Sequence, residues 1–241
     1  MSSNKILAIS SSRVGNSGYL ETVVPLIESF IGGKPTKIAF LPFASAESNY
    51  EEYALRIKKA FNNLPYLIET VLPENAKDVI TKSNVLMTGG GNTFKLLHDI
   101  YQLDIFETIR KKVNSGAPYI GWSAGANITG LTIGTTNDMP IIQPQSFNAL
   151  GFIPFQINPH YINQKKKGFN GETRDDRLKE FMMLNPGISI IGLPEGTALQ
   201  LSKSHLKFIG KESGILFHQK NNSGQFVRET ISTTTDLSFL L

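Results

Sequence analysis

The first half of the sequence alternates short apolar runs with longer amphipathic stretches. The apolar runs predict buried strands, and the stretches with apolar side chains at three- and four-residue steps predict helices. Strands are expected at residues 5–10, 37–43, 66–72, 84–88 and 118–122, with helices at 20–31, 50–61, 74–82 and 93–113. Strands that alternate with helices form parallel βαβ units, which bury a sheet on both faces. We therefore expect an α/β fold of the flavodoxin-like type, with a mostly parallel sheet and helices on both faces.

The second half of the sequence is less regular. Beyond Asn137 the chain is punctuated by Pro and Gly, and apolar runs at 152–157 and 188–191 predict further strands. Short runs at 206–209, 214–217 and 226–229 are typical of antiparallel strands. No repeat or linker divides the 241 residues, so one domain over 1–241 is expected.

Composition excludes several classes of protein. The 241 residues contain no cysteine, which rules out disulfide scaffolds, zinc-thiolate sites and a cysteine nucleophile. The formal charge of +4 suits an anionic small substrate as well as nucleic acid, but the basic residues are scattered apart from Arg110–Lys112 and Lys165–Lys167. No apolar run is long enough for a secretory signal or a membrane span. We expect a cytoplasmic protein that binds neither nucleic acid nor a membrane.

A candidate nucleophile follows the predicted strand at 118–122. Gly121-Trp122-Ser123-Ala124-Gly125 is a G-x-S-x-G sequence, typical of a sharp strand-to-helix turn that exposes a serine hydroxyl. The glycines let the strained backbone pass close to adjacent strands, and the backbone N–H of Ala124 would stabilise a developing oxyanion. The alternative is a tight turn without chemistry.

A glycine-rich loop follows the predicted strand at 84–88. Gly89-Gly90-Gly91-Asn92-Thr93 would present unhindered backbone N–H groups at the carboxyl end of a parallel strand. Neither nucleotide-binding motif is satisfied, because Phe94 replaces the last glycine of G-x-G-x-x-G and no G-K-[ST] follows. We interpret Gly90 or Gly91 as an oxyanion donor, with a flexible turn as the alternative.

A serine nucleophile needs a base, and His160 is the best placed of the histidines. It follows Asn158-Pro159 at the end of the apolar segment 152–157, so a strand would deliver its imidazole to the sheet edge. His98 falls on the polar side of a predicted helix. His205 and His218 lie in the C-terminal strands, where surface roles are expected. A purely structural role for His160 remains open.

The base needs a carboxylate to fix its tautomer, and two residues in turn-like contexts qualify. Asp138 lies in Thr-Asn-Asp-Met-Pro at 136–140, and Glu195 follows the apolar strand at 188–191. Spacing alone does not choose between Asp138 and Glu195. Either could be a surface carboxylate that hydrogen-bonds its own turn.

Together the motifs closely resemble the peptidase E family of α-aspartyl dipeptidases. They are GGGNTF at 89–94, YIGWSAGAN at 119–127, TTNDMP at 135–140, QINPHYIN at 156–163, GETR at 171–174 and GLPEG at 192–196. The resemblance implies a cytoplasmic serine peptidase with a fold like the class I glutamine amidotransferases. It also implies a small dipeptide substrate with an N-terminal aspartate and no metal or cofactor. We expect a monomer or homodimer.

The resemblance assigns roles to individual residues. Ser123 matches the nucleophile and His160 the base. The motif that carries Asp138 implies that residue as the acid, whereas the nucleophile-His-Glu order of the related folds favours Glu195. Geometry also favours Glu195, because His160 and Glu195 would both follow neighbouring strands at the carboxyl end of the sheet. Both residues are retained. Selectivity for aspartate requires a fixed cation, because a carboxylate buried without a partner is costly. Arg174 is the candidate; otherwise it begins a helix and pairs with Asp175 or Glu172.

Two other functions fit parts of the sequence. A cyanophycinase-like exopeptidase would use similar residues on β-linked aspartyl bonds. A non-catalytic module would instead hold an anion with the glycine-rich loop and Lys165–Lys167, and its affinity would fall steeply with salt.

Overall fold

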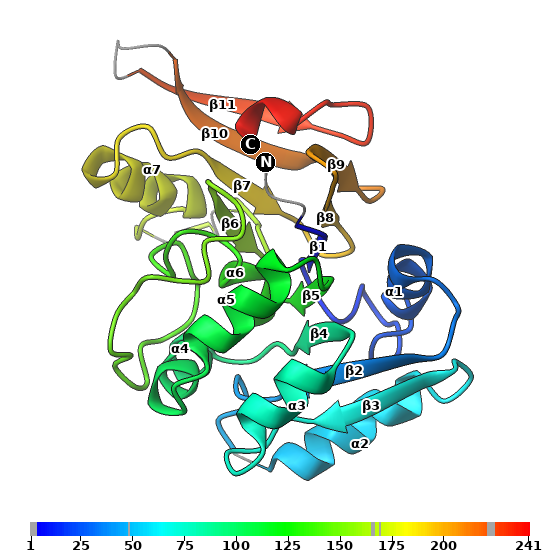
Figure 1. Cartoon of the computed structure of the whole chain (residues 1–241). Helices are drawn as coiled ribbons and strands as arrows, with labels where there is room; N and C mark the ends of the chain where they lie inside the picture. The colour runs from blue at the N-terminus through cyan, green and yellow to red at the C-terminus, as the bar shows by residue number, and fades with distance from the viewer. Residues whose placement is uncertain (1–3, 48, 165–166, 169, 221–224) are drawn as a thin grey trace.

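A seven-stranded sheet lies at the centre of the computed structural model, which describes residues 4–47, 49–164, 167–168, 170–220 and 225–241 (Figure 1). The strand order is β3-β2-β4-β5-β1-β8-β9. The strands are β1 (Ile6–Ile9), β2 (Thr36–Leu41), β3 (Tyr66–Thr70), β4 (Val85–Thr88), β5 (Tyr119–Trp122), β8 (Ala198–Ser202) and β9 (His205–Ile209). From β3 to β1 the pairings are parallel, and β8 and β9 add antiparallel strands at one edge. The predicted α/β class with a mostly parallel sheet is confirmed.

Helices cover both faces of this sheet because alternate strand residues point to opposite sides. On one face Leu7 and Ile9 of β1 belong to the core formed with α1 (Val24–Ile31) and α2 (Tyr50–Ala60). On the other, Ile6 and Ala8 belong to a core formed with four helices. These are α3 (Ala76–Lys82), α4 (Thr93–Gln102), α5 (Phe106–Asn114) and α6 (Ala124–Asn127).

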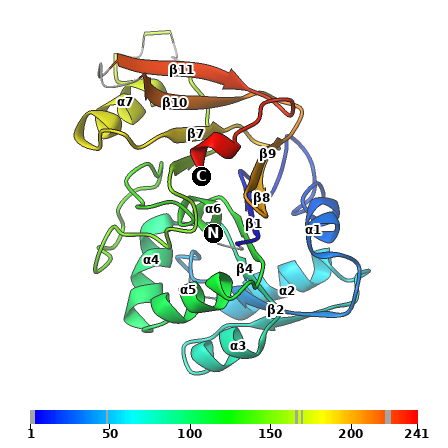
Figure 2. The same cartoon turned by 45° about the horizontal axis from the view of Figure 1, so that its top comes forward.

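A second, four-stranded sheet lies beside the first, in the order β11-β10-β7-β6 (Figure 2). Its strands are β6 (Gln156–Pro159), β7 (Ile190–Leu193), β10 (Gly214–Lys220) and β11 (Gln225–Ile231), and α7 (Arg174–Leu184) packs on it through Leu178 and Met182. The antiparallel C-terminal strands were predicted. That β6 and β7 leave the main sheet was not, because a buried apolar run does not reveal which sheet it joins.

Two predicted helices differ from the structure. The stretch 93–113 is divided into α4 and α5, because Asp104 takes a left-handed conformation (φ 50°) between them. The helix expected from residue 20 begins only at Val24, with Pro25 in its first turn, where the missing backbone N–H has no intrahelical partner to lose.

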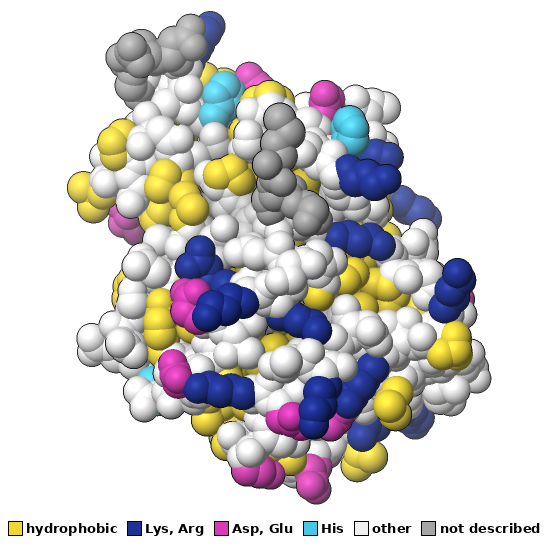
Figure 3. All heavy atoms as spheres, in the orientation of Figure 1, with side chains coloured by type: hydrophobic (Ala, Val, Ile, Leu, Met, Phe, Trp, Pro, Cys, Tyr) yellow, Lys and Arg dark blue, Asp and Glu magenta, His cyan; other side chains and the backbone are white. Residues whose placement is uncertain are grey.

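Charged side chains are spread over the surface. On the face shown in Figure 3, Lys and Arg side chains are dispersed and several lie beside acidic ones. Two of the exposed ion pairs join Lys77 to Asp104 and Lys82 to Asp78. Lys165 and Lys166 of the predicted basic run lie outside the described residues. Within the described ranges, none of the helices combines the length and apolar character that crossing a bilayer requires.

Candidate active site

Ser123 occupies a strained turn between β5 and α6. Its backbone angles are φ 53° and ψ −115°, a region that non-glycine residues rarely adopt. The flanking glycines make the turn possible: a Cβ on Gly121 would lie 2.1 Å from the Gly125 carbonyl oxygen, and one on Gly125 would lie 2.4 Å from that of Thr88. The predicted strand-to-helix turn is confirmed, and the packing explains both glycines of the motif.

Two more side chains complete a hydrogen-bonded chain that begins at Ser123. His160 Nε2 lies 3.0 Å from Ser123 Oγ, and His160 Nδ1 lies 2.9 Å from Glu195 Oε1. His160 follows β6 and Glu195 follows β7, which pair in parallel as neighbours. The expectation that these residues follow neighbouring strands is therefore confirmed. About two-fifths of the His160 side chain (41%) and half of the Glu195 side chain (54%) are exposed, so solvent screens this pair in part.

Ser10 holds the two strand ends together. Its side chain is fully buried, donates to the Leu193 carbonyl oxygen at 2.8 Å and accepts the backbone N–H of His160 at 2.9 Å. His160 itself has a left-handed backbone (φ 51°), so this bond fixes an unusual conformation. Sequence reasoning missed Ser10. The available signal was a polar residue that ends an otherwise apolar strand.

The glycine-rich loop lies against Ser123. A Cβ on Gly90 would lie 2.9 Å from Ser123 Cβ, and Gly91 has φ 141° with its Cβ position 2.2 Å from the Ala44 carbonyl oxygen. Within the described part of the chain, the backbone N–H groups of Gly90, Gly91 and Ala124 donate to no protein acceptor. Three backbone donors without a protein acceptor in the described residues therefore belong to Ser123's own turn and to the loop packed against it.

A buried tyrosine orients this loop. Tyr53 of α2 donates its hydroxyl to the Gly90 carbonyl oxygen at 3.0 Å, and Tyr19 donates to Tyr53 at 3.3 Å. Because the C=O and N–H of a trans peptide point in opposite directions, the bond turns the N–H of Gly91 away from Tyr53. Burial raises the pKa of both tyrosines, so their hydroxyls remain protonated donors. The helical pattern indicated Tyr53 only as a core residue.

Asp138, the other candidate for the acid, hydrogen-bonds to residues other than His160. Its Oδ2 accepts the backbone N–H of Thr93 at 2.7 Å, the Thr93 hydroxyl at 2.5 Å and the Thr136 hydroxyl at 3.2 Å. Thr93 is the first residue of α4, so the carboxylate also lies at a helix N-terminus, which favours negative charge. Among the described residues Asp138 makes no hydrogen bond to His160, whereas Glu195 does.

Arg174 and Asp138 both line a small cavity. The cavity has a volume of about 210 Å³ and is also lined by Ser123, Ala124 and His160. Arg174 donates to Asn158 Oδ1 at 3.3 Å. Burial lowers the pKa of its guanidinium, with a smaller contribution from nearby Arg177.

Arg174 does not pair with Asp175 or Glu172, the alternative considered from the sequence. Asp175 instead binds Tyr161 and Arg228, the latter at 2.9 Å, while Glu172 lies 3.7 Å from Arg177. Across the described ranges, no acidic side chain forms an ion pair with Arg174. A partly buried cation without an anion is a suitable receptor for a substrate carboxylate.

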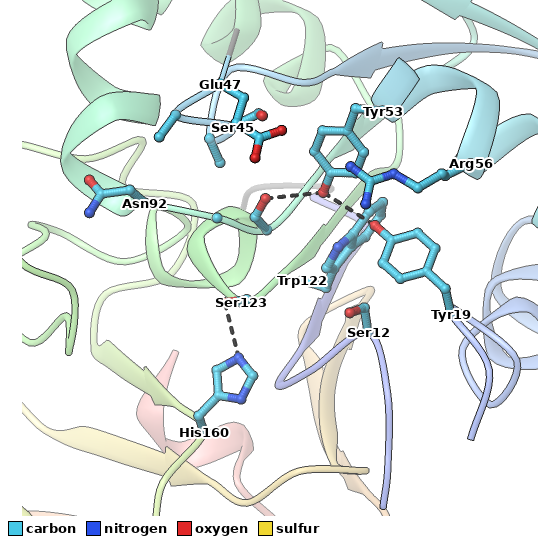
Figure 4. Close-up of a pocket in the computed structure, with 14 residues that line it drawn as sticks. Ser12, Tyr19, Ser45, Glu47, Tyr53, Arg56, Asn92, Trp122, Ser123 and His160 are labelled. Atoms are coloured by element: carbon cyan, nitrogen blue, oxygen red, sulfur yellow. Dashed lines mark hydrogen bonds between the residues drawn. The ribbon is translucent and has the colours of Figure 1, made fainter. Parts of the chain in front are cut away.

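A second, larger cavity also borders Ser123 (Figure 4). Its volume is about 450 Å³, and its charged side chains are Arg56 and Glu47. Tyr53, Trp122 and the glycine-rich loop form much of the wall. The Ser123–His160 pair thus borders both cavities.

Comparison with known proteins gives a consistent result. The sequence model of peptidase family S51 matches residues 6–209. A protein named peptidase E from Nostoc sp. is 43% identical over 218 residues, 90% of each chain. One of the same name from Haemophilus influenzae is 44% identical over 210 residues, 86% of this chain and 96% of that one. The solved structure of a peptidase from an acI-B1 actinobacterium has a TM-score of 0.63 at 20% identity, over 95% of this chain and 96% of that one, and shares the fold.

Proposed function

This chain belongs to peptidase family S51 and is a peptidase, and from that premise we propose that it is a serine dipeptidase that hydrolyses Asp-Xaa dipeptides. The relationship to peptidase E predicted from the motifs is confirmed by the matches. One observation carries the proposed specificity. The small cavity beside Ser123 presents a cation, Arg174, and a carboxylate, Asp138, which together complement an N-terminal aspartyl residue.

The proposed reaction begins at Ser123. His160 Nε2 accepts the hydroxyl proton as Ser123 Oγ bonds to the carbonyl carbon of the aspartyl residue. The tetrahedral intermediate collapses as His160 returns the proton to the leaving nitrogen, and the C–N bond breaks. A water molecule, deprotonated by His160, then attacks the acyl-enzyme and releases aspartate while Ser123 regains its proton. Glu195 orients the imidazole and stabilises its positive charge.

Backbone donors would stabilise the intermediate. Within the described residues, the N–H groups of Gly90, Gly91 and Ala124 have no protein acceptor, and they belong to the serine turn and the loop packed against it. Donors fixed before the reaction stabilise an oxyanion without reorganisation, and the loss of one such donor costs about 3 to 4 kcal/mol in known enzymes. The Tyr53 hydrogen bond to Gly90 holds the loop in this orientation.

The small cavity would bind both charges of the aspartyl residue. Arg174 would receive the side-chain carboxylate. Asp138 would receive the N-terminal ammonium on Oδ1, because the bonds from Thr93 and Thr136 all fall on Oδ2. This arrangement requires a substrate with a free N-terminus, as expected for an exopeptidase that acts on the N-terminal residue. Under this proposal Asp138 binds substrate and is not the acid of the triad.

We expect Arg174→Ala to abolish the preference for aspartate over asparagine at the first position. Charge-assisted hydrogen bonds contribute about 1.5 to 3 kcal/mol each, so the ratio of kcat/KM for Asp-Leu to that for Asn-Leu should fall on the order of a hundredfold. Arg177→Ala on the same helix is the control, because Arg177 faces Glu172 at 3.7 Å and is absent from the cavity wall. An unchanged ratio in Arg174→Ala would remove the assignment.

We expect Asp138→Asn to raise KM for Asp-Leu by about tenfold or more, because the ammonium loses an ionised partner. N-acetyl-Asp-Leu carries no ammonium, so the preference for the free dipeptide over the acetylated one should shrink in parallel. Asp78→Asn, which changes the charge equally at an exposed ion pair, is the control. A lower kcat at unchanged KM would instead return Asp138 to a catalytic role.

A panel of dipeptides analysed by mass spectrometry tests the proposed function itself. Asp-Leu should be hydrolysed, while Asn-Leu, Glu-Leu and the β-linked isomer of Asp-Leu should be poor substrates. Efficient cleavage of the β-linked isomer would favour the cyanophycinase-like alternative. No cleavage of any member, with binding of anions that weakens steeply with salt, would favour the non-catalytic module.

A further inference from the structure

The larger cavity next to Ser123 has one strong cation in its wall. Of the basic side chains, only Arg56 and His160 line it within the described part of the chain. His160 already contacts Ser123 and Glu195. Any anionic group of a molecule in this cavity therefore has Arg56 as its available cationic partner.

Arg56 is exposed and its charge is not neutralised by a neighbouring acid. Its guanidinium carbon lies 5.4 Å from the centre of the Tyr53 ring, a cation–π contact, and no carboxylate pairs with it across the described ranges. In Figure 4 the side chain reaches from α2 toward Tyr53, and its guanidinium lies beside the Tyr53 ring. The hydroxyls of both tyrosines stay neutral, because burial raises their pKa. The guanidinium thus keeps its charge and its donors.

The chemistry of the reaction fixes what enters this cavity. If the small cavity binds the aspartyl residue, the leaving residue on the other side of the scissile bond needs a different space, and the larger cavity also borders Ser123. In a dipeptide, the α-carbon of the leaving residue carries a free carboxylate next to the scissile nitrogen. A longer peptide has a neutral amide at that position. A cation in this cavity therefore distinguishes dipeptides from longer peptides.

Glu47, the acidic side chain in the same cavity, limits where a substrate carboxylate can lie. Glu47 and Arg56 reach in from different sides of Tyr53 in the view of Figure 4. A carboxylate placed near Glu47 would be repelled, whereas one near Arg56 would be attracted. The negative end of the leaving residue is therefore directed toward Arg56.

We propose that Arg56 binds the C-terminal carboxylate of the leaving residue and so restricts this peptidase to dipeptides. This inference rests on the proposed function, because it needs cleavage at Ser123 with the aspartyl residue in the opposite cavity. The size of the cavity, about 450 Å³, allows the leaving residue to vary while its carboxylate stays anchored.

The test compares Asp-Leu with Asp-Leu-amide, which differ only in the terminal carboxylate. For the wild type, kcat/KM should be higher for Asp-Leu, and for Arg56→Gln the ratio of the two values should fall about tenfold, as expected for a partly solvated charge-assisted contact. Higher ionic strength should lower the ratio in the wild type but not in Arg56→Gln. Arg13→Gln is the matched control, because Arg13 stacks on Tyr19 at 5.7 Å but does not line the cavity.

The outcomes separate the two proposals. A wild type that cleaves neither compound contradicts the proposed function. A wild type that cleaves them, with a ratio that Arg56→Gln leaves unchanged, overturns the role of Arg56 and leaves the proposed function standing. If Arg56→Gln instead loses the preference for Asp-Leu over Asn-Leu, the two cavities have been assigned in reverse and the inference is overturned.

Discussion

Replacing Ser123 with alanine should lower the turnover of Asp-Leu by several orders of magnitude. In the proposed mechanism the substitution removes the oxygen nucleophile that forms the acyl-enzyme, and members of a catalytic triad act as a unit, so losing one removes most of their combined effect. Folding should be intact. Alanine has the same Cβ as serine and accepts the same strained backbone, so the free energy of unfolding should change by less than about 1 kcal/mol.

Kinetics by mass spectrometry measures the turnover of Asp-Leu, and thermal unfolding by circular dichroism measures the stability of the fold. Ser115→Ala is the control, because Ser115 only caps α5 through the Lys111 carbonyl oxygen. Turnover by Ser123→Ala near the wild-type level, with the same products, would end the serine-peptidase proposal. Binding of Asp-Leu distinguishes a loss of catalysis from a loss of folding. Ser123→Ala should still bind Asp-Leu, whereas an unfolded variant would not.

Glu195→Gln should lower kcat on the order of a hundredfold to a thousandfold, with little change in KM. Glutamine keeps the shape of the side chain but removes the charge that stabilises the imidazolium and fixes its tautomer. The loss in a well-buried triad is about ten-thousandfold. Here about half of the Glu195 side chain is exposed, so water already screens part of its charge and a smaller effect is expected.

Comparison of Glu195→Gln with Asp138→Asn shows which of the two carboxylates acts as the acid of the triad. We expect the kcat effect from Glu195 and the KM effect from Asp138, because Glu195 hydrogen-bonds to the imidazole and Asp138 lines the small cavity. Glu212→Gln is the control, since Glu212 lines the same groove as Glu195 without touching His160. The reverse pattern, with Glu195→Gln nearly wild-type, would identify Asp138 as the acid.

Local patterns in the sequence predicted the central sheet. Each parallel strand contains a short apolar run, and motifs mark the carboxyl ends of two of them: the glycine-rich loop after β4 and the serine turn after β5. Such patterns report what a segment buries but not which sheet it joins. The separate sheet of β6 and β7 therefore emerged only from the structure, although their adjacency was foreseen.

The acid could not be chosen from sequence because the deciding contacts are long-range. Asp138 and Glu195 both follow turn-forming residues, and only the fold shows that Asp138 reaches Thr93, 45 residues earlier. Ser10, Tyr53 and Arg56 were missed for the same reason. Each lies within or beside an ordinary apolar or amphipathic pattern. The partners of Ser10 and Tyr53 are distant in the sequence, and Arg56 lines a cavity that only the fold assembles.

The structure of Ser123→Ala with bound Asp-Leu is the most direct test of the arrangement proposed here. We expect the aspartyl carboxylate on Arg174 and the ammonium on Asp138. The scissile carbonyl oxygen should lie at the backbone N–H groups of the glycine-rich loop and Ala124, and the leucine should lie in the cavity that Arg56 lines. A dipeptide bound with its scissile carbonyl turned away from residue 123 and His160, or bound outside both cavities, would contradict it.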